Sequence, residues 1–202
     1  MISILYYGLG NIGSICNALE FLHIKYKVIN SKEDILKANK LILPGVGSFS
    51  EGIKKIRDNN FEESIKEAVL VKKIPVLGIC LGFQLFAEEG EEGGKFKGLG
   101  FLKGSVQRFS FKNNEAKIPH IGFNTVFLRK SKLFENLGEE CDFYFMHSYK
   151  FVCEEEDSIT SVCNYYEEFV SSIGKENIFG VQFHPEKSQS NGLRVIQNFS
   201  NL

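Results

Sequence analysis

A cysteine stands between two glycines at the end of an apolar run, in the stretch 74-IPVLGICLGFQLFAEEG-90. Gly78 and Gly82 lie two residues to either side of Cys80, which is the spacing of a sharp strand-to-helix turn that carries a nucleophile. Such a turn strains its middle residue and exposes that side chain, so the flanking residues must be small. The pattern predicts Cys80 as a nucleophile. A tight structural turn around a buried cysteine is the alternative.

The residues after Cys80 favour a helix over 81–86 whose N-terminus is directed at the sulfur. Free N–H groups and the positive end of the helix dipole stabilise a thiolate. The same N–H groups can donate hydrogen bonds to a developing oxyanion. One placement would therefore activate the nucleophile and stabilise the intermediate that it forms.

A nucleophilic thiol needs a base, and the chain offers four histidines. His184 directly follows a β-prone segment, and Glu186 two residues later can hold its imidazole in one tautomer. The pattern favours His184 as the base, with an ordinary turn as the alternative. His147 follows an aromatic strand, and His120 lies in a predicted loop where it could also take part in chemistry. His23, at the end of a helical pattern, is expected to be structural or on the surface.

Composition bounds the remaining possibilities. The 202 residues fit a single domain, 1–202, with 43% hydrophobic residues, 24% charged residues and a formal net charge of -1. Nothing in this balance indicates a nucleic-acid or membrane surface held by charge, and no apolar run reaches the length of a membrane span. The N-terminus lacks a basic signal region, so we expect a cytoplasmic protein. The five cysteines are irregularly spaced, which argues against a disulfide framework and against a metal site.

The elements that must position these residues alternate in the first half of the chain. Such alternation predicts an α/β, doubly wound, mostly parallel central sheet flanked by helices. We expect strands over 2–6, 26–29, 40–43 and 75–79, and helices over 12–22 and 51–72.

The second half is rich in short β-prone pieces, which predict additional antiparallel strands. The pieces are 106–109, 126–128, 143–146, 161–163, 170–173 and 179–181, and a last helix is expected over 193–199. The acidic, glycine-rich segment 88–94 is expected to be a solvated loop, with a functional lid as the alternative.

Several motifs, taken together and in this order, resemble the class I (triad-type) glutamine amidotransferases. Each motif is modest alone, but their joint occurrence along nearly the whole chain is specific. The resemblance implies a flavodoxin-like fold and no cofactor. The motifs are 7-YGLGN-11, 43-LPGVGSF-49, 77-LGICLGFQ-84, 119-PHIG-122, 144-YFMHSY-149 and 180-GVQFHPEKS-188.

The resemblance implies a role for each residue of the triad. Cys80 would attack the side-chain amide carbon of L-glutamine and form a glutamyl thioester. His184 would exchange the proton and deliver it to the leaving ammonia, while Glu186 orients His184. Water would then release glutamate.

The resemblance also implies an oxyanion hole and a substrate-binding wall. The oxyanion hole would use the backbone N–H groups of Leu81 and of the Val46–Gly47 loop, which could turn a peptide toward the site. Gln84 resembles a substrate-holding side chain, with an ordinary helical residue as the alternative. The wall, whose members could instead be packing groups, comprises His147, Ser148 and Tyr149.

Within the family, the chain resembles the branch that serves histidine biosynthesis. The resemblance implies a heterodimer with a (β/α)8-barrel cyclase, to which ammonia is channelled directly. Asn11, Phe123 and Lys187 fall at positions that the resemblance puts on the partner face. A turn residue at 11 and a solvated charge at 187 are the alternatives.

Two departures from the family pattern leave the acceptor open. Phe123 stands where the family usually has tryptophan, and Tyr6 stands where aspartate is commoner. Phe123 bears on gating and on the choice of partner. The stretch that begins at Tyr6 resembles a branch that uses ammonia to make an amidine in surface-sugar biosynthesis. The same motifs also leave room for a glutaminase that serves a different synthetase, for a peptidase-like or chaperone-like cysteine hydrolase, and for a non-catalytic binding module of the same fold.

Overall fold

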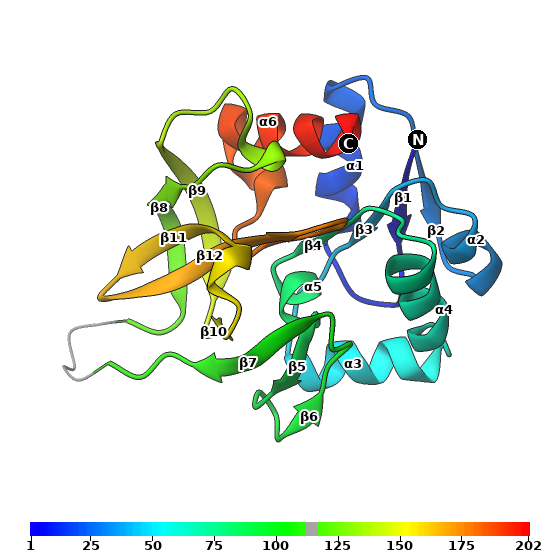
Figure 1. Cartoon of the computed structure of the whole chain (residues 1–202), viewed down its shortest axis with the longest axis horizontal. Helices are drawn as coiled ribbons and strands as arrows, with labels where there is room; N and C mark the ends of the chain where they lie inside the picture. The colour runs from blue at the N-terminus through cyan, green and yellow to red at the C-terminus, as the bar shows by residue number, and fades with distance from the viewer. Residues whose placement is uncertain (112–116) are drawn as a thin grey trace.

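The computed structural model describes residues 1–111 and 117–202. The strands among these residues form one mixed sheet, whose centre is parallel (Figure 1). The doubly wound α/β class expected from the sequence is confirmed. The parallel strands are, in sheet order, β2 (Tyr26–Ile29), β1 (Ile2–Leu5), β3 (Leu41–Leu43), β4 (Val76–Ile79) and β13 (Ile178–Val181).

Strands that pair mostly antiparallel continue the sheet beyond β13, as the sequence predicts, although β5 pairs parallel with β7. Strand β12 pairs antiparallel with β13 and leads through β10 to β7, β5 and β6, while β11, β8 and β9 branch from β12 as a separate ribbon (Figure 1). Their bounds are β5 (Ala87–Gly90), β6 (Phe96–Lys97), β7 (Leu102–Arg108), β8 (His120–Leu128), β9 (Glu140–His147), β10 (Tyr149–Cys153), β11 (Ile159–Tyr165) and β12 (Glu167–Lys175).

Helices cover both faces of the parallel strands. Helices α1 and α6 lie on one face, and α2, α3, α4 and α5 lie on the other (Figure 1). The bounds are α1 (Ile12–Phe21), α2 (Lys32–Leu36), α3 (Phe49–Asp58), α4 (Glu62–Lys66), α5 (Leu81–Gln84) and α6 (Gln189–Asn201). A π-helical turn, η1 (Glu67–Val71), continues α4, and 3-10 turns are η2 (Lys132–Phe134), η3 (Glu156–Ser158) and η4 (Pro185–Lys187).

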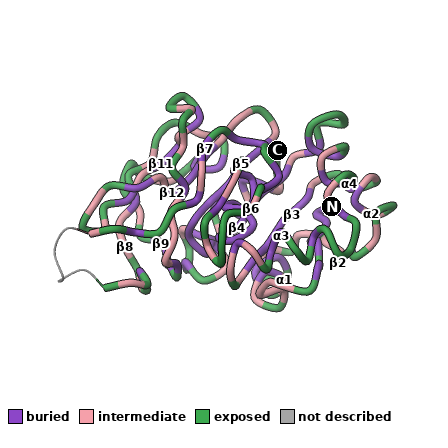
Figure 2. Tube along the Cα trace, turned by 90° about the horizontal axis from the view of Figure 1, so that it is seen from below, coloured by how far each residue is buried: buried purple, intermediate pink, exposed green. Residues whose placement is uncertain are grey.

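Two hydrophobic cores lie on the two faces of the sheet. Leu41 and Leu43 of β3 point into the core under α2–α5, whereas Ile42 between them points into the core under α1 and α6. A strand that is buried on both sides has a continuous apolar sequence instead of an alternating one. The central strands are accordingly the most buried part of the trace (Figure 2).

Three local expectations were wrong. The helix after Cys80 ends at Gln84 instead of continuing to residue 86. The segment 88–94 is not simply a solvated loop, because its first residues belong to β5, which pairs with β7. His120 begins strand β8 instead of lying in a loop.

Two structural observations concern membrane-spanning helices and metal-binding groups. Among the described residues, no helix has both the length and the apolar character that crossing a membrane requires. Within residues 1–111 and 117–202, no group of three or more His, Cys, Asp or Glu side chains is arranged to hold a metal ion.

Candidate active site

Cys80 occupies a strained turn between β4 and α5. Its φ of 53° and ψ of -110° lie in a region that non-glycine residues rarely adopt. The flanking glycines are required by packing. A Cβ on Gly78 would lie 2.7 Å from the backbone of Phe83, and one on Gly82 would overlap the carbonyl oxygen of Leu43. The turn expected from the G-x-C-x-G pattern is confirmed, although Cys80 is only 6% exposed.

His184 and Glu186 form a buried pair next to this turn. His184 Nδ1 lies 2.8 Å from Glu186 Oε1, and the two side chains are 2% and 1% exposed. A carboxylate only accepts hydrogen bonds, so Nδ1 carries the proton in this contact. Burial lowers the pKa of His184, but hydrogen bonding and charge from Cys80, and then from Glu186, outweigh it and raise the pKa to about 10. The arrangement favours a protonated ring at His184.

Two buried atoms of this pair have no hydrogen-bond partner among the described residues. They are His184 Nε2 and Glu186 Oε2. Nε2 therefore remains available to exchange a proton, and Cys80 is close enough to raise the pKa of the ring even without ideal hydrogen-bond geometry. Because Glu186 Oε2 has no hydrogen-bond partner among the described residues, Glu186 contacts His184 through Oε1 alone.

A narrow cavity of about 60 Å³ opens onto Cys80. It collects predicted residues from four separate parts of the chain. The predicted residues that line it are Val46, Gly47, Cys80, Leu81, Gln84, His147, Tyr149 and His184. Glu186 lies behind His184 instead of lining the cavity, and Ser148 is absent from the lining, its carbonyl accepting a hydrogen bond from the Phe109 N–H at 3.2 Å.

The Val46–Gly47 loop is anchored at its base. The Tyr7 hydroxyl donates to the carbonyl of Pro44 at 2.8 Å. A Cβ on Gly45 would lie 2.7 Å from Gly82 N, so this residue packs directly against the turn that carries Cys80. Gly47, in contrast, is exposed and has a φ of 103°. The free end of the loop thus lies at the cavity, and its fixed end is part of the core.

Gln84 is held by hydrogen bonds on its nitrogen. Nε2 donates to Tyr149 O at 3.0 Å and to Gln182 Oε1 at 2.9 Å. Both N–H groups of this amide are therefore used within the protein. Its carbonyl Oε1 is the atom that can serve a ligand in the cavity.

A pair of buried, neutral histidines supports the wall of the cavity. His147 Nδ1 lies 2.8 Å from Tyr149 O, so it donates to that carbonyl. Its Nε2 must then accept from His120 Nδ1 at 3.1 Å. Burial lowers the pKa of His147 to about 3 and that of His120 to about 4. His120 also stacks on Tyr165, with ring centroids 3.9 Å apart. His120 therefore supports the wall and does not touch the cavity.

Sequence reasoning missed two residues that line the cavity, Glu92 and Met146. Glu92 Oε2 accepts a hydrogen bond from Phe49 N at 2.9 Å, which brings the acidic segment against the start of α3. Burial raises the pKa of Glu92, and the Phe49 N–H partly opposes this. The segment 88–94 contains four glutamates, and only the fold distinguishes Glu92 from the others.

The three residues expected on a partner face all lie outside the cavity. Phe123 is 51% exposed on β8. Its ring meets the Tyr144 ring edge-on, with the two ring centroids 5.6 Å apart. Lys187 places Nζ over the same Tyr144 ring at 5.7 Å. Asn11 precedes α1 and makes no capping hydrogen bond with its side chain.

An exposed apolar group extends from Phe123 to the cavity. Ile121 is 58% exposed on the same face of β8, and Met146, which pairs with Ile121 across the ribbon, is 38% exposed. Because Met146 also lines the cavity, the apolar group and the cavity are continuous.

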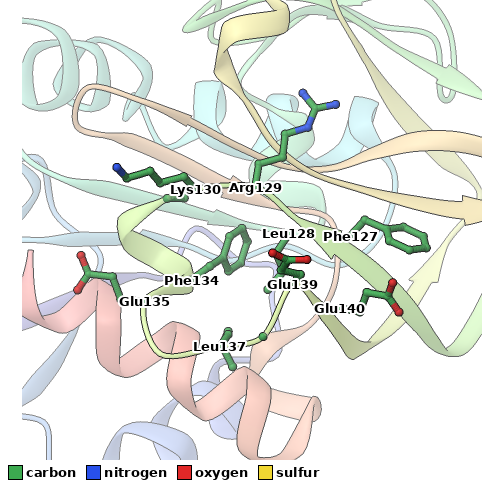
Figure 3. A pocket seen from close by; sticks show the side chains of 11 residues that line it. Phe127, Leu128, Arg129, Lys130, Phe134, Glu135, Leu137, Glu139 and Glu140 are labelled. Carbon is green, nitrogen blue, oxygen red and sulfur yellow. The ribbon is translucent and has the colours of Figure 1, made fainter.

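A wider hollow of about 490 Å³ lies elsewhere, at the corner formed by β8, η2 and β9. Its charged side chains, among them Arg129, Lys130 and Glu135, point in different directions (Figure 3). It contains none of the predicted site residues. Volume alone therefore does not identify the reactive site in this fold.

The fold agrees with the comparisons with known proteins. The sequence profile of the family "Glutamine amidotransferase class-I" matches residues 3–201. The chain therefore belongs to the class-I glutamine amidotransferase family. Two solved structures share its fold: one described as a glutamine amidotransferase (TM-score 0.77, 20% identity, 100% and 99% of the two chains) and PurLQS from Thermotoga maritima (TM-score 0.69, 20% identity, 99% and 97%).

Sequence relatives are more specific. A Campylobacter jejuni (strain 81-176) protein named imidazole glycerol phosphate synthase subunit HisH 1 is 44% identical over 100% of both chains. A Methanococcus maripaludis protein named imidazole glycerol phosphate synthase subunit HisH 2 is 44% identical over 98% of both. A Pseudomonas aeruginosa HisH 2 is 39% identical over 100% of both. The chain is thus similar along its whole length to HisH subunits.

Proposed function

We propose that this chain is the glutaminase subunit of an imidazole glycerol phosphate synthase, which hydrolyses L-glutamine and supplies ammonia for histidine biosynthesis. One observation carries the assignment of residues. A buried His–Glu pair adjoins a strained cysteine turn, and Cys80, Gln84 and His184 line the same cavity. The proposal for the pathway is supported by the full-length similarity to HisH subunits.

The reaction starts from the thiolate of Cys80 and the imidazolium of His184. The sulfur attacks the side-chain amide carbon, and the amide oxygen becomes an oxyanion. His184 Nε2 gives its proton to the nitrogen, the C–N bond breaks, and ammonia leaves behind a glutamyl thioester. A water molecule then gives a proton to His184 and attacks the thioester carbon, and the C–S bond breaks to release glutamate. Glu186 holds the ring in the tautomer that both steps require.

The lining of the cavity suits the other groups of glutamine. The backbone N–H groups of Leu81 and of the Val46–Gly47 loop would stabilise the oxyanion. Gln84 Oε1 offers an acceptor for a substrate N–H. Glu92 offers a carboxylate for the α-ammonium group of the substrate, with which it would form a charge-assisted hydrogen bond.

A HisH subunit works with a partner subunit. We propose that the partner is a (β/α)8-barrel cyclase that binds over the cavity and receives ammonia directly. Ammonia that escaped into water would be diluted and protonated, so a covered exit is needed. The exposed apolar group of Ile121, Phe123 and Met146, continuous with the cavity, supports a docking face there.

The test is glutamate release by the purified chain, alone and with the cyclase subunit from the same genome and its nucleotide ligand. Cys80→Ala should abolish release and leave folding and partner binding near normal. Cys141→Ala, at a half-buried cysteine outside the cavity, is the control. Release by Cys80→Ala above the uncatalysed background would refute the nucleophile.

A second acceptor is favoured by the start of the chain. The stretch that begins at Tyr6 resembles a surface-sugar branch, in which a related barrel subunit makes an amidine. If the histidine-pathway cyclase does not stimulate a chain whose Cys80 still reacts with a glutamine-like electrophile, the pathway assignment is wrong and the chemistry stands. A chain that neither reacts nor hydrolyses glutamine would be a non-catalytic module.

A further inference from the structure

Gln182 carries a fully buried side-chain amide for which the glutaminase reaction, as derived from the triad, has no role. It follows β13 and precedes His184 by two residues, a spacing that keeps two side chains on one side of an extended chain. Its Nε2 lies 3.6 Å from Cys80 Sγ, and its Oε1 accepts a hydrogen bond from Gln84 Nε2 at 2.9 Å. The amide therefore bridges the nucleophile and a side chain that lines the cavity.

The orientation of this amide follows from its neighbours. Gln84 Nε2 donates to Tyr149 O, and a primary amide nitrogen has donors and no acceptor. The atom of Gln182 that faces Gln84 must therefore be its oxygen. Its NH2 group consequently faces the sulfur of Cys80, so the direction of both contacts is determined by chemistry.

We propose that Gln182 is a further catalytic residue of the glutaminase site, donating an N–H to the Cys80 thiolate while its oxygen fixes the carbonyl of Gln84 toward the substrate. The inference rests on the proposed function, because it assigns a role within the same reaction. A donor next to sulfur favours the thiolate over the thiol. Because Gln182 is uncharged, its donor persists after His184 has given up its proton.

Other titratable groups lie near the sulfur, so the experiment compares the alkylation midpoint of each variant with that of the wild type. Tyr7, whose pKa is raised by burial and then by the charge of Cys80, lies close to the sulfur. The other titratable groups around the sulfur are His184 with Glu186 behind it, His147, Tyr149 and Glu92.

Two substitutions separate the two contacts of Gln182. Gln182→Glu has the same shape and keeps an oxygen for Gln84, but it has no N–H for the sulfur. Gln182→Met has a similar size and lacks both groups. Gln107→Met is the control, because the Gln107 amide is exposed on β7 and donates to Ser105 Oγ.

The first measurement is the rate of iodoacetamide alkylation against pH, read by mass spectrometry on the peptide that contains Cys80. We expect the midpoint to rise by about half a unit to one unit in Gln182→Met, and further in Gln182→Glu, whose carboxylate adds a like charge. The second measurement, with the cyclase present, is KM for glutamine, which should rise several-fold in Gln182→Met and remain near wild type in Gln182→Glu. Gln107→Met should match the wild type in both.

Unchanged alkylation midpoints in the folded variants would overturn the inference, with thermal unfolding as the check on folding. If Gln182→Met does not fold, the isosteric Gln182→Glu decides alone. The two proposals fail separately. Glutamate release by Cys80→Ala would refute the proposed function, whereas an inactive Cys80→Ala combined with an unshifted Gln182→Glu would refute only the role of Gln182.

Discussion

Glu186→Gln tests the buried pair with the smallest possible change of shape. The substitution removes the negative charge that His184 Nδ1 contacts at 2.8 Å and keeps an oxygen able to accept that hydrogen bond. A hydrogen bond to a charged group stabilises by about 1.5–3 kcal/mol, and one between neutral groups by about 1 kcal/mol. The loss of charge alone therefore costs the imidazolium about 0.5–2 kcal/mol.

The second oxygen of Glu186 adds to this cost. If the amide introduced by Glu186→Gln turns its oxygen to His184, its NH2 replaces Oε2, a buried atom without a partner among the described residues, at a further cost of about 1–3 kcal/mol. If it turns its nitrogen to His184, the ring must carry its proton on Nε2 and cannot accept the thiol proton. Together these terms give about 1.5–5 kcal/mol, which is a fall in kcat/KM of about 10- to 5,000-fold.

The assay is steady-state glutamate release with the cyclase partner, for wild type, Glu186→Gln and the control Glu176→Gln. Glu176 pairs with Lys73 at the surface, where both side chains are more than half exposed, so its loss should leave kcat/KM within about twofold. A Glu186→Gln enzyme within about twofold of the wild type would refute the view that Glu186 orients and charges His184.

The same variant predicts a change in how stability depends on pH. The pKa of His184 in the folded chain, about 10, lies above its ordinary value of 6.5. Its protonation therefore stabilises the native state fully below about pH 6.5, and this stabilisation is lost as the pH rises toward 10. Because Glu186 is one cause of the raised pKa, the loss should finish at lower pH in Glu186→Gln. Thermal unfolding from about pH 6 to 10 measures it, and parallel curves for the two proteins would contradict the pKa shift.

Two further predictions concern the rim of the cavity. Phe123→Trp should change how strongly the cyclase ligand stimulates glutamate release more than it changes KM for glutamine, because the ring lies on the exposed apolar group and not in the cavity; unaltered stimulation would mean that this position is not at the docking face. Glu92→Gln should raise KM for glutamine about tenfold and leave kcat nearly unchanged, because a neutral amide loses the charge-assisted contact with the α-ammonium group. An unchanged KM would exclude Glu92 from substrate binding. The control is Glu91→Gln, because the Glu91 carboxylate accepts a hydrogen bond from Arg108 N at the surface.

The sequence predicted the parts of the site that local geometry determines. The turn at Cys80 needs small flanking residues whatever surrounds it, so the G-x-C-x-G pattern is sufficient to find it. The central strands were recognised because burial on both faces makes them continuously apolar. The sequence did not reveal Glu92 and Gln182 as site residues, because only the fold brings Glu92 next to Phe49 N and Gln182 next to Cys80 Sγ. His120 was misplaced in a loop because its strand partner, His147, is 27 residues away.

The anchored base of the Val46–Gly47 loop has a consequence for regulation. The Tyr7 hydroxyl donates to the Pro44 carbonyl, and Gly45 packs against Gly82. The Val46–Gly47 peptide can therefore rotate while the residues before it stay in place. Neither hydrophobic core includes Val46 or Gly47, so neither core has to repack when this peptide rotates. If turning this peptide switches the activity, both hydrophobic cores would stay as they are, and we expect the same thermal unfolding midpoint in either state.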